Sequence, residues 1–234
     1  MNEDEDVTRI IVARAMRRFE RWQRQVHERS DRIFGYLFVG QWLFCIGVAA
    51  WVAPYVIDDL DGAIHPHVVA ATTLGLGVIA FPLLLIRTQP GAVATRHVVA
   101  VAQMLLSALI IYVTNGRIES HFHVFGSLAF LAFYLDWKVL VTATTVTLLD
   151  HALRGAFDPR SIYGVDAVEW TRFVEHAFWI LFALAFLVHH TSRTLASWLR
   201  FAEEGGMLEA MAESEWRARS VVEREREERE ERTA

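Results

Sequence analysis

The apolar residues of this chain gather into long stretches between residues 33 and 190, while both ends are densely charged. Hydrophobic residues make up 53% of the 234 residues, and the mean hydropathy is +0.25. A helix needs about 20 apolar residues to cross the ~30 Å hydrocarbon core of a bilayer. We therefore expect an all-α integral membrane protein with a bundle of six spans, at residues 33–57, 68–86, 98–114, 121–136, 139–157 and 171–190.

The composition divides the chain into three regions: a leader at 1–32, the membrane domain at 33–192 and a charged tail at 193–234. In the leader, apolar residues recur among the arginines every three or four positions, which predicts a cytoplasmic amphipathic helix. It is too polar to be a cleavable signal peptide. Such a helix either lies on the inner leaflet or packs against the tail helix.

The tail contains no proline and combines spaced apolar residues with Glu-Arg repeats. This pattern favours a cytoplasmic coiled-coil helix that forms a homodimer, although Gly205 and Gly206 interrupt it. The other interpretation is a solvated single helix. Because the chain stops in a charged helix, we expect it to be the input half of a longer protein, or else an adaptor that works with a downstream signalling domain or partner protein.

Arginine and lysine predict the orientation in the membrane. The leader is rich in arginine, and Arg87, Arg96 and Lys138 fall on the same side, whereas the loop at 58–61 has three aspartates and no basic residue. Basic residues favour the cytoplasmic side, so both termini are expected in the cytoplasm. The basic residues are interleaved with acids, so a nucleic-acid partner is not indicated.

Ionisable side chains gather near the predicted outer ends of three spans. They are Glu119, His121 and His123 at the start of the fourth span, Asp150 and His151 near the end of the fifth, and Glu175 and His176 near the start of the sixth. Such groups are costly in hydrocarbon and mark functional sites. Helix rise places the histidines in one layer, so imidazoles from three helices are expected to converge, as in metal sites of helix bundles.

These donors predict a transition-metal site. The expected ligands are His123, His151 and His176, with His121 or a carboxylate completing the shell. Glu119 and His123 share a helix face, whereas His121 points nearly opposite. Nitrogen and oxygen donors suit iron, zinc or copper, and haem is less favoured. The single cysteine, Cys45, lies in an apolar run and is interpreted as a core residue.

Other interpretations of the same residues stay open. The histidines at 121 and 123 can be interfacial residues, Asp150 can pair with Arg154, and Glu175 can pair with Arg172 on its own helix. Functionally, a metal-linked membrane sensor competes with a metal-free histidine pH sensor and with a metal-dependent membrane enzyme of hydrolase or oxygenase type. No nucleophilic serine or phosphate-binding glycine loop is evident, so no catalytic residue is assigned and an enzyme is the less favoured reading.

Four short segments resemble a known kind of protein. They are residues 117–137, with His121 and His123; residues 149–155, with Asp150 and His151; residues 161–165; and residues 175–179, with Glu175 and His176. Over residues 30–200 the chain is similar to the multi-span input domain of bacterial sensor histidine kinases. The resemblance implies a two-component sensor in the bacterial inner membrane, with the histidine-bearing segments as the ligand or metal-binding region. An acidic residue expected soon after Trp179 is missing.

Overall fold

The computed structural model describes residues 3–52 and 65–233, and within these ranges all regular secondary structure is helical, with no β-strand. The elements are α1 (Glu3–Val52), α2 (Pro66–Thr88), α3 (Val93–Val113), α4 (Ile118–Leu131), a short 3-10 helix η1 (Ala132–Tyr134), α5 (Trp137–Phe157), α6 (Arg160–Tyr163) and α7 (Trp170–Thr233). The expected all-α class is confirmed. The end of the first expected span, 53–57, and the acidic loop at 58–61 lie outside the described residues.

The chain forms two compact units. One contains Arg24–Arg193, and the other combines the residues up to Gln23 with those from Thr194 onward. Helices α1 and α7 each contribute to both units. The predicted leader is therefore not a separate helix, because α1 runs without a break from Glu3 to Val52.

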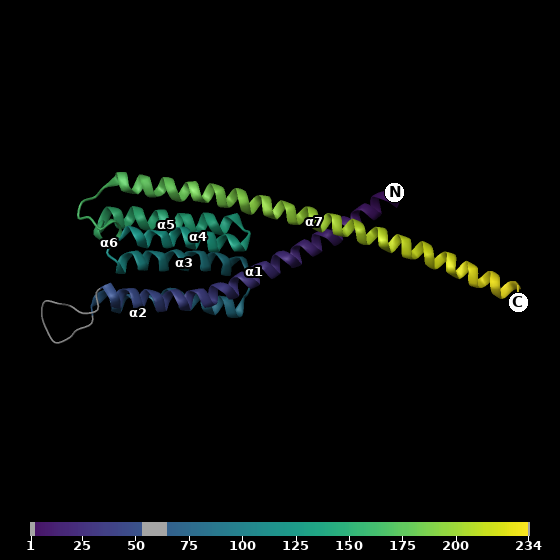
Figure 1. Ribbon diagram of the computed structural model, residues 1–234, viewed down its shortest axis with the longest axis horizontal. Coiled ribbons are helices and arrows are strands. Elements are labelled where there is room, and N and C mark those ends of the chain that lie inside the picture. The colour runs from purple at the N-terminus through teal and green to yellow at the C-terminus, as the bar shows by residue number, and fades with distance from the viewer. Residues whose placement is uncertain (1–2, 53–64, 234) are drawn as a thin grey trace. The chain divides into compact units, whose positions relative to one another are not determined.

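The larger unit is a helix bundle in which α2, α3, α4 and α5 run side by side with parts of α1 and α7 (Figure 1). Helix α3 is its most enclosed helix, and an apolar core surrounds it. Phe34 and Phe38 of α1 pack with Leu106 of α3, Leu128 of α4 and Leu140 of α5 in that core. Burial of these side chains holds antiparallel neighbours together across the short connections.

Four described helices are long and apolar enough to cross a membrane, namely those at Arg9–Val52, Pro66–Thr88, Val93–Val113 and Trp170–Arg232. Their outer faces support this. Leu74, Phe81 and Leu84 of α2 are each more than half exposed, a pattern that suits contact with lipid. The coarse prediction of several helices long and apolar enough to span a membrane is confirmed.

Helices α4 and α5, the fourth and fifth expected spans, are not among the helices that are long and apolar enough to cross a membrane. Helix α4 has only 14 residues before it tightens into η1. Helix α5 has 21 residues but carries Lys138, Asp150 and Arg154. The chain reverses between them at Leu135, whose φ of 51° is left-handed, and at Asp136, whose side chain accepts a hydrogen bond from the Lys138 amide. This side-chain cap begins α5.

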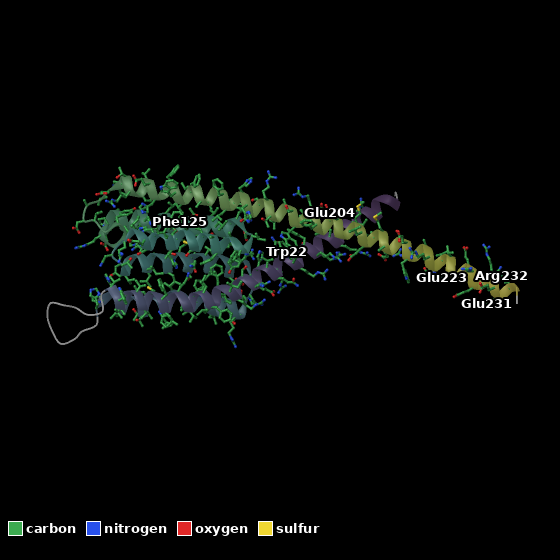
Figure 2. The ribbon with its side chains drawn as sticks, in the orientation of Figure 1. Trp22, Phe125, Glu204, Glu223, Glu231 and Arg232 are labelled. Carbon is green, nitrogen blue, oxygen red and sulfur yellow. The ribbon has the colours of Figure 1, made fainter. Side chains whose placement is uncertain are left out.

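The smaller unit is a pair of helix segments from α1 and α7. Trp22 stacks on Trp198 with ring centroids 4.4 Å apart, and Arg14 pairs with Glu213 at 2.8 Å. Gly205 and Gly206 interrupt the apolar period of the tail but not its helix, because α7 continues through them. Gly206 instead lies against α1, where a Cβ would be 3.4 Å from the Ile11 carbonyl oxygen. Of the two positions expected for the leader, the structure therefore favours packing against the tail. Figure 2 labels charged side chains of the remaining tail, among them Glu223 and Arg232.

Candidate functional site

Three imidazoles meet at one end of the larger unit. His121 lies three residues after the start of α4, His151 lies near the end of α5, and His176 lies in the second turn of α7. Their ring centroids are 5.5 Å apart for His121 and His151, 5.0 Å for His121 and His176, and 5.7 Å for His151 and His176. We call these three residues the histidine triad. The predicted convergence of three helices is therefore present.

Each ring of the triad is held in the same way by its own helix. The Nδ1 atoms of His121, His151 and His176 lie 3.0, 3.0 and 2.7 Å from the main-chain carbonyl oxygens four residues earlier. A carbonyl oxygen only accepts hydrogen bonds, so each Nδ1 carries the proton. A ring with its proton on Nδ1 can offer Nε2 to a metal ion, and this is the arrangement seen in many histidine ligands.

A small cavity of about 20 Å³ lies between the three rings. Its other walls are mostly apolar side chains, including Val124 of α4 and Ile180 of α7. His121 is 5% exposed, and its Nε2 is buried with no hydrogen-bond partner in the part of the chain that the structure describes. A buried nitrogen without a partner costs free energy unless something binds it. The cavity has room for about one water-sized species.

Asp150 supports the triad from behind and does not line the cavity. Its Oδ2 lies 3.4 Å from Nδ1 of His151. Arg154 holds the carboxylate with two hydrogen bonds, from Nε to Oδ1 at 2.8 Å and from Nη2 to Oδ2 at 2.7 Å. The ion pair between Asp150 and Arg154, one of the alternatives for this acid, is therefore present. The same carboxylate also helps to orient His151. A carboxylate behind a ligating histidine is a common feature of metal sites.

Tyr163 was not anticipated from the sequence. It ends the four-residue helix α6, and its ring centroid lies 5.4 Å from that of His176. Its hydroxyl donates to the carbonyl oxygen of His151 at 3.4 Å. Burial raises the pKa of Tyr163 to about 12, so the phenol stays neutral. Gly155 makes room for this ring, because a Cβ there would lie 2.9 Å from Tyr163 Cε2.

His123 does not join the triad, which corrects the expected ligand set. Its Nδ1 lies 2.8 Å from the Ser107 hydroxyl, and its Nε2 lies 3.1 Å from Nε2 of Gln41. Both ring nitrogens are thus used in a polar network between α1, α3 and α4. His121 takes the inward position instead. The start of α4 at Ile118 and the contact with α1 set this rotation of the helix.

The remaining predicted acids lie outside the triad. Glu119 is exposed and pairs with Arg117 at 3.5 Å. Glu175 is exposed beside His176, and the ion pair suggested between it and Arg172 is not formed, because Arg172 binds Glu169. Neither carboxylate lines the cavity between the rings.

A second buried polar cluster, which is not predicted from the sequence, lies at the other end of the bundle. Asp31 of α1 is fully buried and accepts hydrogen bonds from the Tyr134 hydroxyl and the Gly91 amide, each at 2.6 Å. Nearby, Arg96 of α3 pairs with Asp136 at 3.1 Å. In the sequence, Asp31 stands at the edge of an apolar stretch, and this position is the feature that could have indicated its burial. The cluster ties α1 to the turns between α2 and α3 and between α4 and α5.

The rings of the triad are spaced as in a metal site, but their side chains are not arranged to hold an ion. Three imidazoles around a tetrahedral ion have centroids about 5.2 Å apart when each nitrogen is about 2.1 Å from the metal. The observed separations bracket this value. As it stands, however, no group of three or more His, Cys, Asp or Glu side chains within 3–52 and 65–233 is arranged to hold an ion.

The comparisons with known proteins add no family to this picture. No family model, curated protein or solved structure matches the chain. The resemblance to sensor input domains is therefore still a hypothesis, and only the residues themselves indicate a function.

Proposed function

We propose that this chain is a membrane sensor domain in which His121, His151 and His176 bind one transition-metal ion. The observation that carries the proposal is the shared arrangement of the three rings. Each Nδ1 donates to a carbonyl of its own helix, and the Nε2 of His121 is left buried without a partner. Three imidazoles whose Nδ1 atoms are engaged present Nε2 as the donor atom, and such nitrogen donors suit zinc, copper or iron.

Ion binding would require the rings to turn, while the helices are already at a suitable spacing. Side-chain rotation is a small change compared with a movement of packed helices. His176 belongs to α7, which continues without a break to Thr233. A pull on His176 would therefore act on the same helix that carries the charged tail, and this continuity is the proposed route from ion occupancy to a signalling output.

The proposed topology has six crossings, with the triad near the outer face of a bacterial inner membrane and both termini in the cytoplasm. Of the six proposed crossings, the one by α4 has the shortest helix, with only 14 residues. Two sets of contacts support a full crossing. Arg96, in the first turn of α3, pairs with Asp136 in the turn before α5. Asp31 of α1 accepts hydrogen bonds both from Gly91, between α2 and α3, and from Tyr134 at the end of η1. The turn between α4 and α5 thus lies level with the turn between α2 and α3. Helix α4 with η1 spans about 27 Å by helix rise.

The decisive experiment is metal analysis of the full chain purified in mild detergent. After loading with Zn²⁺, Co²⁺ or Cu²⁺ and removal of excess ion, we expect about one ion per chain. His151→Ala and His176→Ala should each lose most of this metal. His123→Ala is the matched control, because it removes an imidazole of the same helix end whose nitrogens are bound to Ser107 and Gln41.

The outcomes separate the competing functions. Absence of stoichiometric metal in the unsubstituted chain would contradict both the metal sensor and a metal-dependent enzyme. A change of tail association with pH in that metal-free protein would then favour a histidine pH sensor. Equal loss of metal in His123→Ala and His176→Ala would contradict the ligand set proposed here.

A further inference from the structure

An open groove of about 560 Å³ runs between α4 and α7 beside the triad. Its walls are aromatic, with Phe122 and Phe125 from α4 and Trp179, Phe182 and Phe186 from α7. All five rings are more than a third exposed. Figure 2 labels Phe125 within the bundle. The volume is in the range of small-molecule sites, which are commonly apolar with a few polar groups at one place.

The groove and the cavity between the rings have walls in common. His121, His176 and Phe125 line both of them. The polar groups of the groove are therefore the two histidines, together with Glu175 beside them. His121, whose Nε2 is buried without a partner in the described part of the chain, is one of the shared residues. Apart from these groups the groove offers apolar and mostly aromatic surface, so polarity is concentrated where the ion would be.

We propose that this groove binds a neutral, flat aromatic molecule that carries one nitrogen or oxygen lone-pair donor. The inference rests on the proposed metal function. Three histidines leave one position of a tetrahedral ion open for an exchangeable ligand. The donor atom occupies that position, and the aromatic body lies against the rings of α4 and α7, where offset and edge-on ring contacts are favourable. No bond in the ligand is made or broken, and only the fourth metal ligand is exchanged.

Other occupants lack part of this chemistry. A lipid acyl chain would fill the groove without a donor atom and without a preference for aromatic walls. A second copy of the chain would cover the groove but would leave the fourth metal position unchanged. A pair of probes with the same shape distinguishes these cases: 4-phenylpyridine has a nitrogen donor at one end, and biphenyl has a carbon in its place.

The test uses the full chain in detergent, loaded with Co²⁺, whose visible absorption bands report changes in coordination. We expect 4-phenylpyridine to change these bands in a saturable way and biphenyl to leave them unchanged. Ala183 lines the groove, so Ala183→Trp should fill it and weaken the response to 4-phenylpyridine by about tenfold or more. Its cobalt content should stay at that of the unsubstituted chain.

Ala185→Trp is the matched control, because Ala185 is exposed on the same helix and does not line the groove. It should keep both cobalt and the full response. Full cobalt content without any response to 4-phenylpyridine would overturn this inference alone, and so would an unaltered response in Ala183→Trp. Failure of the unsubstituted chain to bind cobalt, zinc or copper would instead overturn the proposed function, and this inference with it.

Discussion

The imidazole ring of His121 lies nearly edge-on to that of His176, with centroids 5.0 Å apart and planes at 64°. The two residues come from α4 and α7 and are 55 positions apart in sequence. Contact between rings on two separate helices requires both helices to carry their histidine at the same level of the bundle and to turn it towards the other helix. This is the relationship on which the metal proposal depends, because His151 alone on α5 would be only a buried polar residue.

Asp150→Asn should weaken metal binding without abolishing it. The carboxylate lies 3.4 Å from Nδ1 of His151 and is fixed by Arg154, so its removal takes away an oriented negative charge behind a ligand. Loss of such a supporting group typically costs about 10 to 100-fold in metal affinity. Competition with a chelator of known affinity measures the change.

Glu119→Gln is the control for this substitution, because Glu119 is exposed and pairs only at 3.5 Å with Arg117. It should leave the affinity unchanged. Monodisperse elution of both variants would show that they fold. Equal affinity in Asp150→Asn and the unsubstituted chain would mean that Asp150 serves only to neutralise Arg154.

Gly155→Ala should destabilise the protein, although the same change inside an ordinary helix stabilises it by about 0.5 to 1 kcal/mol. Here the new Cβ would lie 2.9 Å from Cε2 and 3.3 Å from the hydroxyl oxygen of Tyr163. Overpacking of this kind costs about 1 to 3 kcal/mol, so the clash outweighs helix propensity. Thermal unfolding in detergent should show a lower midpoint.

Gly126→Ala provides the contrast within α4, because nothing lies within 4 Å of the Cβ that it would add. Its midpoint should be unchanged or higher. In a Tyr163→Ala background, Gly155→Ala should no longer destabilise the chain. A stable Gly155→Ala variant with the tyrosine in place would contradict the observed position of the Tyr163 ring.

The level of the site in the bundle could be predicted from the sequence, but which histidines converge there could not. His151 and His176 lie near the ends of apolar stretches, and counting residues from those ends is enough to place them in one layer. The choice between His121 and His123 depends on the rotation of α4. That rotation is set by long-range contacts such as Gln41 with His123, which no local pattern encodes.

Tyr163 and the Asp31 cluster were missed for a related reason. Tyr163 sits on a helix of four residues in a connection, where periodicity gives no signal. Asp31 looked like part of a charged leader, and its burial follows only from the approach of Tyr134 and Gly91. Helical content, by contrast, follows from local apolar runs and the scarcity of breakers, and this part was predicted well.

Tyr134→Phe should lower stability by about 1 to 3 kcal/mol, because it leaves one oxygen of a buried carboxylate without its donor. The Tyr134 hydroxyl donates to Asp31 at 2.6 Å, and both residues are fully buried. Chemical denaturation in detergent measures the loss. Tyr36→Phe removes the same hydroxyl from a residue that is 83% exposed, and it should be close to neutral. Similar stability of the two variants would contradict a structural role for this hydrogen bond.

The six-crossing topology predicts opposite labelling of two exposed positions. In a Cys45→Ala background, Asp166→Cys should react with a membrane-impermeant maleimide added to intact spheroplasts. Lys138→Cys should react only after lysis, because the turn before α5 lies level with the turn between α2 and α3. Cys45 is fully buried, so alanine at that position is a small change. Labelling of Lys138→Cys in intact spheroplasts would contradict a full crossing by α4.

The pairing of α1 with α7 in the smaller unit predicts a rescue by charge exchange. Arg14→Glu replaces an ion pair with Glu213 by two like charges and should loosen the pair of helix segments. Hydrogen exchange should then be faster at the amides of α7 around Glu209 and Glu213. Combining Arg14→Glu with Glu213→Arg restores opposite charges and should return the exchange towards that of the unsubstituted chain. Because exposed ion pairs are screened, the difference between the single and the double variant should shrink at high salt. If exchange in α7 were the same in all three proteins at low salt, the contact between Arg14 and Glu213 would have no part in holding the tail against α1.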